Sequence, residues 1–263
     1  MTALLEIRKL GKRFPSRHGR EPSPWVIQDL SFTVADGELL TIVGPSGAGK
    51  STLLNIIAQT DTASAGEIIF NGVPVTTRDP RALKPGLDRR IGYVTQDDNL
   101  LPWRNTLDNV LFSLDVQGRL DSEGHARAQK LIEAVGLAGF ETYYPHELSG
   151  GMRKRTALIR TLVYDPPIIL MDEPFAAVDA QTRMQLQADL LRLRDLGRKT
   201  IVFVTHDITE AIALGDRALV LSKQPSRIAA EHNIPIPRPR NVKDIFALPG
   251  FAATYEKIRA DVQ

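Results

Sequence analysis

The sequence predicts an α/β protein built on a largely parallel sheet. Three observations predict it: short apolar segments of strand length, amphipathic segments of helix length between them, and turns rich in Gly or acidic residues where strands end. Strands that alternate with helices favour parallel pairing, because parallel neighbours need a crossover connection. With 263 residues, 43% of them hydrophobic, the chain can bury one substantial core and a small appended subdomain.

The N-terminal third is rich in strands. The expected strands are residues 4–10, 26–34, 38–43, 66–70 and 91–95. A Gly-rich turn follows the third strand, and a helix is expected from about residue 50 to residue 58.

The middle of the chain has helical spacing over residues 106–136, where Leu107, Val110, Leu111 and Leu114 share one face. We interpret it as an inserted helical subdomain over about residues 97–150. The alternation then resumes with a helix over 151–164, a helix over 180–196, and strands over 168–171, 200–204 and 218–221. The proline-rich residues 234–240 predict an extended link to a terminal helix near 251–260, so we expect one domain over 1–235 and a C-terminal extension over 236–263.

Composition disfavours several classes of protein. Lys and Arg total 33 against 31 Asp and Glu, so the formal charge of +2 does not favour a nucleic-acid binder. The absence of cysteine fits a reducing compartment. The N-terminus alternates apolar and charged residues, unlike an export signal, and no apolar stretch approaches the ~18 residues of a spanning helix. Any membrane role is expected to be peripheral.

The strongest motif is a phosphate loop between an expected strand and an expected helix. It fits G-x-x-x-x-G-K-[ST], with Lys50 placed to reach the β- and γ-phosphates and Ser51 to ligate Mg²⁺. A flexible Gly-rich turn is the alternative, but the strand and helix context favours phosphate binding. The residues expected to bind ATP here are Gly44, Pro45, Ser46, Gly47, Ala48, Gly49, Lys50, Ser51 and Thr52.

Two adjacent carboxylates end the buried strand IILMDEP. We expect Asp172 to hold Mg²⁺ through water and Glu173 to orient or deprotonate the attacking water. Taken alone this pattern is weak, since strands commonly end in acidic residues at a turn.

A third motif, LSGGMRKR over residues 148–155, narrows the choice among phosphate-loop proteins. Ser149 is expected as a helix N-cap followed by Gly150 and Gly151, which would make a second anion-binding helix end, although an ordinary capped helix would look the same. LSGG at this place before IILMDEP resembles the signature sequence of ABC ATPases. That resemblance implies a P-loop NTPase (RecA-like) core with an antiparallel β subdomain and an inserted helical subdomain of ABC type.

The resemblance extends to further landmarks in family order, over about the first 230 residues. Gln96 resembles the Q-loop glutamine, which senses Mg²⁺ and the attacking water and contacts the permease. His206 resembles the switch histidine that contacts the γ-phosphate, and Asp179 resembles the D-loop aspartate at the dimer junction. By this resemblance the catalytic residues are Glu173, His206 and Gln96.

An aromatic residue is expected to stack on adenine. Phe14 resembles the family's stacking position, and Trp25 is a rival; either could instead pack in the core. Because stacking tolerates either ring, the type of residue does not decide between the two. We choose Phe14 by its place after the first strand.

The resemblance also implies partners. One chain carries one phosphate loop and one signature, so the ATP held by Lys50 of one subunit would be closed by Ser149 and Gly151 of a second subunit, which we expect to be an identical chain. The segment DDNLLPWRNTLDNV after Gln96 resembles importers of nitrate, taurine and aliphatic sulfonates, which implies a separate permease and, indirectly, a solute-binding protein. Trp103 would then lie at the groove for the permease, or else pack within the helical subdomain.

Two other functions remain open from the sequence. One is an ABC ATPase that moves no solute, for example in cofactor assembly; long coiled-coil insertions and tandem copies, which mark repair and translation members, are not found. The other is a phosphotransferase with the same loop, which would leave LSGG and His206 unexplained. A GTPase is disfavoured because no Asn-Lys-x-Asp motif occurs.

Overall fold

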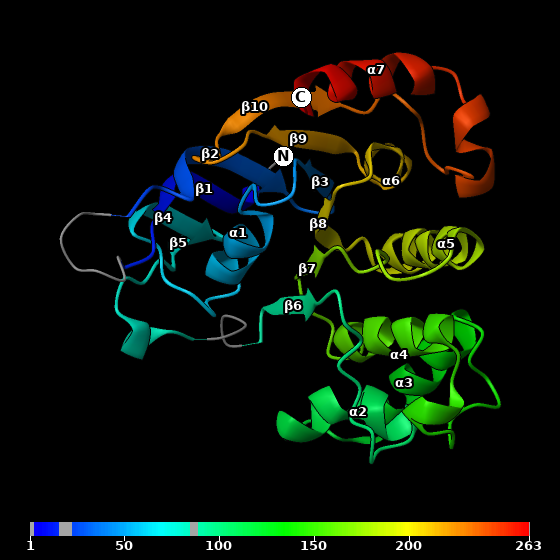
Figure 1. Ribbon diagram of the computed structural model, residues 1–263. Coiled ribbons are helices and arrows are strands. Elements are labelled where there is room, and N and C mark those ends of the chain that lie inside the picture. The colour runs from blue at the N-terminus through cyan, green and yellow to red at the C-terminus, as the bar shows by residue number, and fades with distance from the viewer. Residues whose placement is uncertain (1–2, 16–22, 85–88, 263) are drawn as a thin grey trace.

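The computed structural model describes residues 3–15, 23–84 and 89–262, which form two sheets and the helices around them (Figure 1). An antiparallel sheet with strand order β2-β1-β4-β5 stands beside a larger sheet with order β10-β9-β3-β8-β7-β6. In the larger sheet all pairs are parallel except β10 with β9. The predicted α/β class with a largely parallel sheet is therefore confirmed.

The antiparallel sheet comprises β1 (Ala3–Lys12), β2 (Ile27–Ala35), β4 (Ala65–Phe70) and β5 (Val73–Pro74). The larger sheet comprises β3 (Leu39–Val43), β6 (Ile91–Val94), β7 (Ile168–Asp172), β8 (Thr200–Thr205), β9 (Arg217–Leu221) and β10 (Ile228–Asn233). The helices are α1 (Lys50–Ile57), α2 (Thr106–Val116), α3 (Ser122–Ala134), α4 (Gly150–Leu162), α5 (Ala180–Gly197), α6 (Ile208–Leu214) and α7 (Phe251–Val262). Short 3₁₀ turns are η1 (Pro80–Ala82), η3 (Pro145–Glu147) and η4 (Val242–Ala247).

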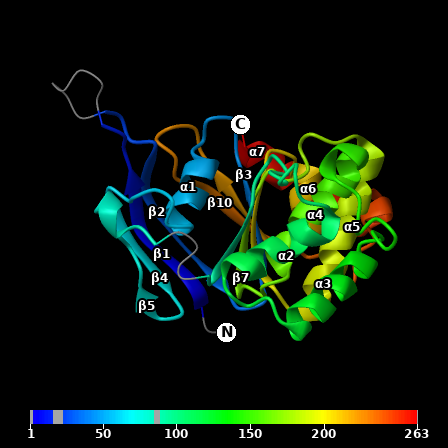
Figure 2. The ribbon, with the colours of Figure 1, turned by 90° about the horizontal axis from the view of Figure 1, so that it is seen from below.

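Helix α1 is packed between the two sheets, as Figure 2 shows. Its buried Leu53, Leu54 and Ile57 join one apolar cluster with Ile7 of β1 and Leu170 of β7. This sandwich fixes the start of α1 against the ends of the parallel strands, which is where α/β sheets bind ligands.

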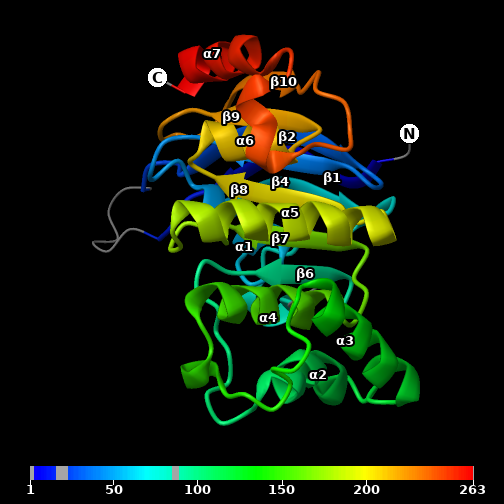
Figure 3. The same ribbon diagram turned by 90° about the vertical axis from the view of Figure 1, so that its right-hand side faces the viewer.

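The opposite face of the large sheet is covered by α4 and α5, with α2 and α3 lying beyond α4 (Figure 3). Leu158 of α4 and Leu190 of α5 pack with Ile169 and Phe203 of the sheet. Helices α2, α3 and α4 all lie between β6 and β7 in sequence, and α2 and α3 fall within the region where the helical subdomain was predicted. The proposed division into residues 1–235 and 236–263 stays a prediction.

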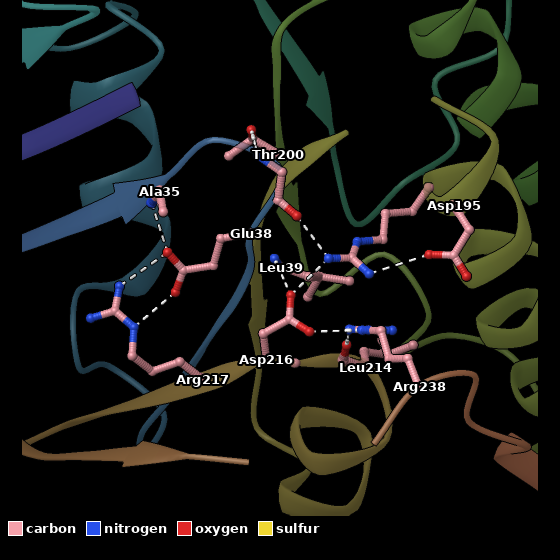
Figure 4. A network of polar contacts seen from close by, with 12 residues as sticks. Ala35, Glu38, Leu39, Asp195, Thr200, Leu214, Asp216, Arg217 and Arg238 are labelled. Carbon is pink, nitrogen blue, oxygen red and sulfur yellow. Dashed lines mark hydrogen bonds and ion pairs between the residues drawn. The ribbon is translucent and has the colours of Figure 1, made fainter. Parts of the chain in front are cut away.

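The C-terminal segment is tied to the sheet by a polar network around Asp216 (Figure 4). Its carboxylate accepts hydrogen bonds from Arg194 of α5 at 2.8 Å, from Arg238 at 2.7 Å and from the Leu39 amide of β3 at 2.8 Å. Residues 234–241 form no helix or strand between β10 and η4, as the prolines predicted. Strand β10 and helix α6 were not predicted.

Candidate functional site: a phosphate loop facing strand-end carboxylates

The loop between β3 and α1 is shaped by glycines. Gly47 and Gly49 have φ angles of 78° and 75°, which side-chain-bearing residues rarely adopt. A Cβ on Gly44 would lie 2.9 Å from the carbonyl oxygen of Leu221, so glycine is also required there by space. The N-cap of α1 is Gly49, which makes no side-chain cap. The first amides of α1 are therefore available to an anion.

Lys50 is buried at the start of α1, with its side chain folded along the loop. Its Nζ donates to the carbonyl oxygens of Gly44 at 2.8 Å and Pro45 at 3.1 Å, and lies 3.8 Å from Oε1 of Glu173. Burial lowers the pKa of Lys50, while Glu173 and Asp172 oppose that shift. A desolvated ammonium held at the mouth of the loop is suited to an anionic ligand.

Asp172 and Ser51 provide neighbouring oxygen atoms where β7 meets α1. Burial raises the pKa of Asp172, and a hydrogen bond from the Ser51 side chain opposes that shift. A hydroxyl and a carboxylate are hard oxygen ligands of the kind that Mg²⁺ accepts, together with water and substrate phosphates. The described residues contain no cluster of three or more His, Cys, Asp or Glu that could hold a metal by itself.

Glu173 connects the phosphate loop with the end of β8. Its backbone has a φ of 44° and its amide donates to the Val204 carbonyl at 3.0 Å, which turns the side chain out of the sheet. Oε2 lies 2.8 Å from Nδ1 of His206. The His206 side chain is 61% exposed, so it can meet a ligand or partner that arrives from solvent.

Lys50, Ser51 and Glu173 border a cavity of about 320 Å³. It is lined by Phe14, Val26, Ser46, Gly47, Ala48, Gly49, Lys50, Ser51, Thr52, Glu173 and Gln224. Phe14 is 46% exposed and lines this cavity. Trp25 does not line it: its ring lies against Gly11 and beneath the Arg13 guanidinium, 5.1 Å from the ring centroid. The geometry favours Phe14 over Trp25 as the stacking residue.

The signature residues border a second cavity, of about 610 Å³. Ser149 caps α4, where its hydroxyl accepts from the Met152 amide at 3.3 Å, and Gly150 and Gly151 form the first turn. Asp179 caps α5 by accepting from the Thr182 amide at 2.9 Å, and that hydrogen bond lowers the pKa of its carboxyl. The lining residues are Ser149, Gly151, Met152, Arg155, Gln181, Thr182, Met184, Gln185 and Lys243.

The two cavities share no lining residue. A single chain therefore brings Lys50, Glu173, Asp172 and His206 together but does not bring Ser149 or Asp179 to them. Gln96 lines neither cavity, and its backbone carbonyl accepts a hydrogen bond from Lys154. The nucleotide half of the predicted site is assembled in one chain, and the signature half faces elsewhere.

The sequence profile described as "ABC transporter" matches residues 27–176. The chain belongs to the ABC transporter family. It is 40% identical to the aliphatic sulfonates import ATP-binding protein of Xanthomonas axonopodis, over 90% of this chain and 88% of that protein. It is 44% identical to the taurine import ATP-binding protein of Yersinia pestis, over 77% of this chain and 76% of that protein.

Among solved structures, this ABC protein resembles the ATP-binding cassette MJ0796, a dimer in a post-hydrolysis state bound to ADP and phosphate. The TM-score is 0.74 at 32% identity, over 88% of this chain and 98% of that one. The predicted ABC-type ATPase, its phosphate-loop fold and its nucleotide cofactor are confirmed at the level of the family.

In each of the two cavities, sequence reasoning missed some of the lining residues. Val26 and Gln224 border the phosphate-loop cavity, while Thr182 and Lys243, among others, border the signature cavity. Val26 precedes a strand and Lys243 lies in η4, so no local motif marks either one. Among the residues that line the phosphate-loop cavity, Gln224 lies furthest in sequence from the loop itself.

Proposed function

We propose that the chain is the ATP-hydrolysing subunit of an importer for a small sulfonate-like or taurine-like solute. The observation that carries the proposal is the similarity, along most of the chain, to two proteins named for import of aliphatic sulfonates and taurine. Among the described residues, no helix has the length and apolar character needed to cross a bilayer. We assign the transport pathway to a separate permease, with this chain at its cytoplasmic face and a solute-binding protein as an indirect partner.

The active unit is proposed to be a dimer of two such chains. The separation of the two cavities supports it, because Ser149 and Gly151 can close a nucleotide only when they belong to a second subunit. Asp179 caps a helix beside the signature cavity and would lie at the same junction. A ligand that contacts both subunits favours the closed pair, and its cleavage removes that preference.

Within each site the residues have separate roles. The loop amides and Lys50 hold the phosphates, Phe14 stacks on the adenine, Glu173 takes the proton of the attacking water, and His206 contacts the γ-phosphate. Ser51 and Asp172, with Gln96, would hold Mg²⁺, which neutralises charge that develops on the phosphate oxygens.

Trp103 is proposed as part of the permease contact. Its side chain is 71% exposed, which argues against packing within the helical region. An exposed tryptophan next to the apolar Leu101 and Pro102 is typical of a protein–protein contact.

The test is reconstitution of this chain with the integral membrane protein that co-purifies with it. Proteoliposomes with ATP on the side of this subunit should accumulate taurine or an alkanesulfonate, and a Glu173→Gln complex should not. Failure to co-purify with any integral membrane protein would favour an ABC ATPase without transport. A phosphorylated metabolite in place of free phosphate would favour a phosphotransferase.

A further inference from the structure

The turn between β9 and β10 comes close to the phosphate loop, although the two are far apart in sequence. At its apex Gln224 donates from Nε2 to the carbonyl oxygen of Gly47 at 2.7 Å. Gln224 also lines the nucleotide cavity. The contact therefore joins a turn near the C-terminal end of the chain to the loop that holds the phosphates.

The turn itself is held in one place by several hydrogen bonds. Ser222 and Arg227 pair across it, with the Ser222 amide donating to the Arg227 carbonyl at 3.0 Å. Buried Ser226 pairs with the start of β2: its amide donates to Val26 at 2.9 Å, and its carbonyl accepts from Gln28 at 3.0 Å. The base from which Gln224 reaches out is thus fixed to both sheets.

Gly47, in contrast, has little packing to hold its conformation. A Cβ built on Gly47 would meet no atom of the described residues within 4 Å, so the side of Gly47 on which a side chain would project is open. Its φ of 78° lies in the left-handed region, which glycine can enter and leave without the steric cost that a Cβ brings. Because a peptide unit is planar, the hydrogen bond to the Gly47 carbonyl also orients the Ala48 amide, which donates to the Pro45 carbonyl at 3.2 Å. The Gln224 contact and this backbone bond therefore hold opposite sides of one peptide of the loop.

We propose that Gln224 is a positioning residue for nucleotide binding, which holds the Gly47 peptide so that the loop is formed before the phosphates arrive. The proposal deepens the proposed function, on which it rests. A loop that is ordered before binding spares the ligand the entropic cost of ordering it. The contact acts on the loop that binds the phosphate chain. The affinities for ATP, ADP and inorganic tripolyphosphate should therefore all depend on it.

The test compares Gln224→Met, which keeps the length of the side chain and removes its donor, with wild type. Affinities for ATP, ADP and inorganic tripolyphosphate are measured by competition against a fluorescent nucleotide. We expect all three to weaken by a similar factor of about 3 to 10, as the net worth of one neutral hydrogen bond implies. KM for ATP should rise by the same factor with kcat little changed, because the loop is ordered equally once ATP is bound.

Gln28→Met is the matched control. Gln28 accepts from Arg227 at 2.8 Å, so this substitution also removes a hydrogen bond to the turn but leaves the phosphate loop untouched. It should leave the three affinities at their wild-type values. Gln224→Ala serves as a second variant should Gln224→Met perturb the cavity.

Several outcomes would overturn the inference. Unchanged affinities in both Gln224 variants would do so, and so would weaker binding of ATP and ADP with unchanged binding of tripolyphosphate, which would make Gln224 a contact to base or ribose. If the Gln224 variants lost Tm in proportion to their loss of affinity, and Gln28→Met showed the same two losses, the contact would be merely structural. Failure of the wild-type protein to bind ATP would instead count against the proposed function.

Discussion

His206 Nδ1 lies 2.8 Å from Glu173 Oε2, so the ends of β7 and β8 are joined through two side chains beside the phosphate loop. If Glu173 is the base, an amide at this position removes the proton acceptor while keeping the size of the side chain and its capacity for hydrogen bonding. Glu173→Gln should hydrolyse ATP at least about 100-fold more slowly, in the range that general bases contribute. Nucleotide affinity should persist, because Lys50 and the loop amides are unchanged.

Steady-state phosphate release, together with ATP-induced dimerisation on a sizing column, measures both expectations. Glu256→Gln on α7 is the control, because its carboxylate is exposed and pairs with Arg259, three residues along the same helix. Full turnover in Glu173→Gln would exclude Glu173 as the base.

Asp172 should make the nucleotide-free protein less stable at neutral pH. Burial raises the pKa of its carboxyl, so between the ordinary aspartate pKa and the raised value the folded protein binds more protons than the unfolded chain. The free energy of unfolding then falls as pH rises through that window. Asp172→Asn should gain about 0.5–1 kcal/mol at pH 7, as removal of an unfavourable charge commonly gives.

Urea unfolding at several pH values, without nucleotide or Mg²⁺, measures this effect. The gain should shrink as the pH is lowered toward the ordinary aspartate value, because the wild-type carboxyl becomes neutral. ATPase activity of Asp172→Asn should be lost at every pH. A variant that is less stable than wild type at pH 7 would contradict the argument.

Phe14 should contribute to ATP affinity and Trp25 should not. Stacking of a base on an aromatic ring is worth ~1–3 kcal/mol, so Phe14→Ala should weaken ATP binding roughly 5- to 150-fold. Phe14→Tyr keeps an aromatic ring and should bind ATP as wild type does. Tripolyphosphate, which lacks the base, should bind Phe14→Ala normally. Trp25→Phe is the control, since its ring lies against Gly11 outside the cavity. If a nucleotide titration showed a larger loss of ATP affinity for the Trp25 variant than for the Phe14 variant, Trp25 would be the residue that stacks on adenine.

The residues of the nucleotide half of the predicted site can be singled out from the sequence because they are local to turns. Lys50 and Ser51 follow one strand and Glu173 follows another, and parallel strands bring their carboxyl ends to one edge of the sheet. Gln224 could not be predicted, because its contact with Gly47 joins residues 177 positions apart and no motif surrounds it. Strand β10 was missed for a related reason: residues 228–233 alternate half-buried and exposed, with no fully buried face.

Asp216 should be important for holding the C-terminal segment. Its carboxylate pairs with Arg194 and Arg238, so Asp216→Asn leaves two guanidinium groups with weaker partners. We expect a loss of about 1–3 kcal/mol in the free energy of unfolding, and faster tryptic cleavage in the segment that Arg238 holds. Asp195→Asn is a matched control: Asp195 also pairs with Arg194 but is half exposed, and should change stability by less than about 0.5 kcal/mol. Equal effects of the two changes in urea unfolding would refute a special role for Asp216.

The contact between Gly151 and Thr182 should decide how α4 meets α5 at the signature cavity. A Cβ on Gly151 would lie 2.7 Å from Cγ2 of Thr182, a distance at which the Thr182 side chain or one of the two helices must shift. Gly151→Ala should therefore leave nucleotide binding by a single chain unchanged, since the Lys50 cavity is separate. ATP-driven dimerisation and ATPase rate should fall, with the rate reduced about 10- to 100-fold, as misplacement by a fraction of an ångström to an ångström can do.

The second substitution Thr182→Ser removes the clashing methyl group and keeps the amide that Asp179 caps. Gly151→Ala with Thr182→Ser should recover most of the rate, whereas Thr182→Ser alone should behave as wild type. Recovery in the double variant assigns the defect to helix position, because the loss of flexibility at residue 151 is the same in both. If the single and double variants were equally slow, flexibility of the Gly151 backbone, and not the spacing of α4 and α5, would be what the signature needs.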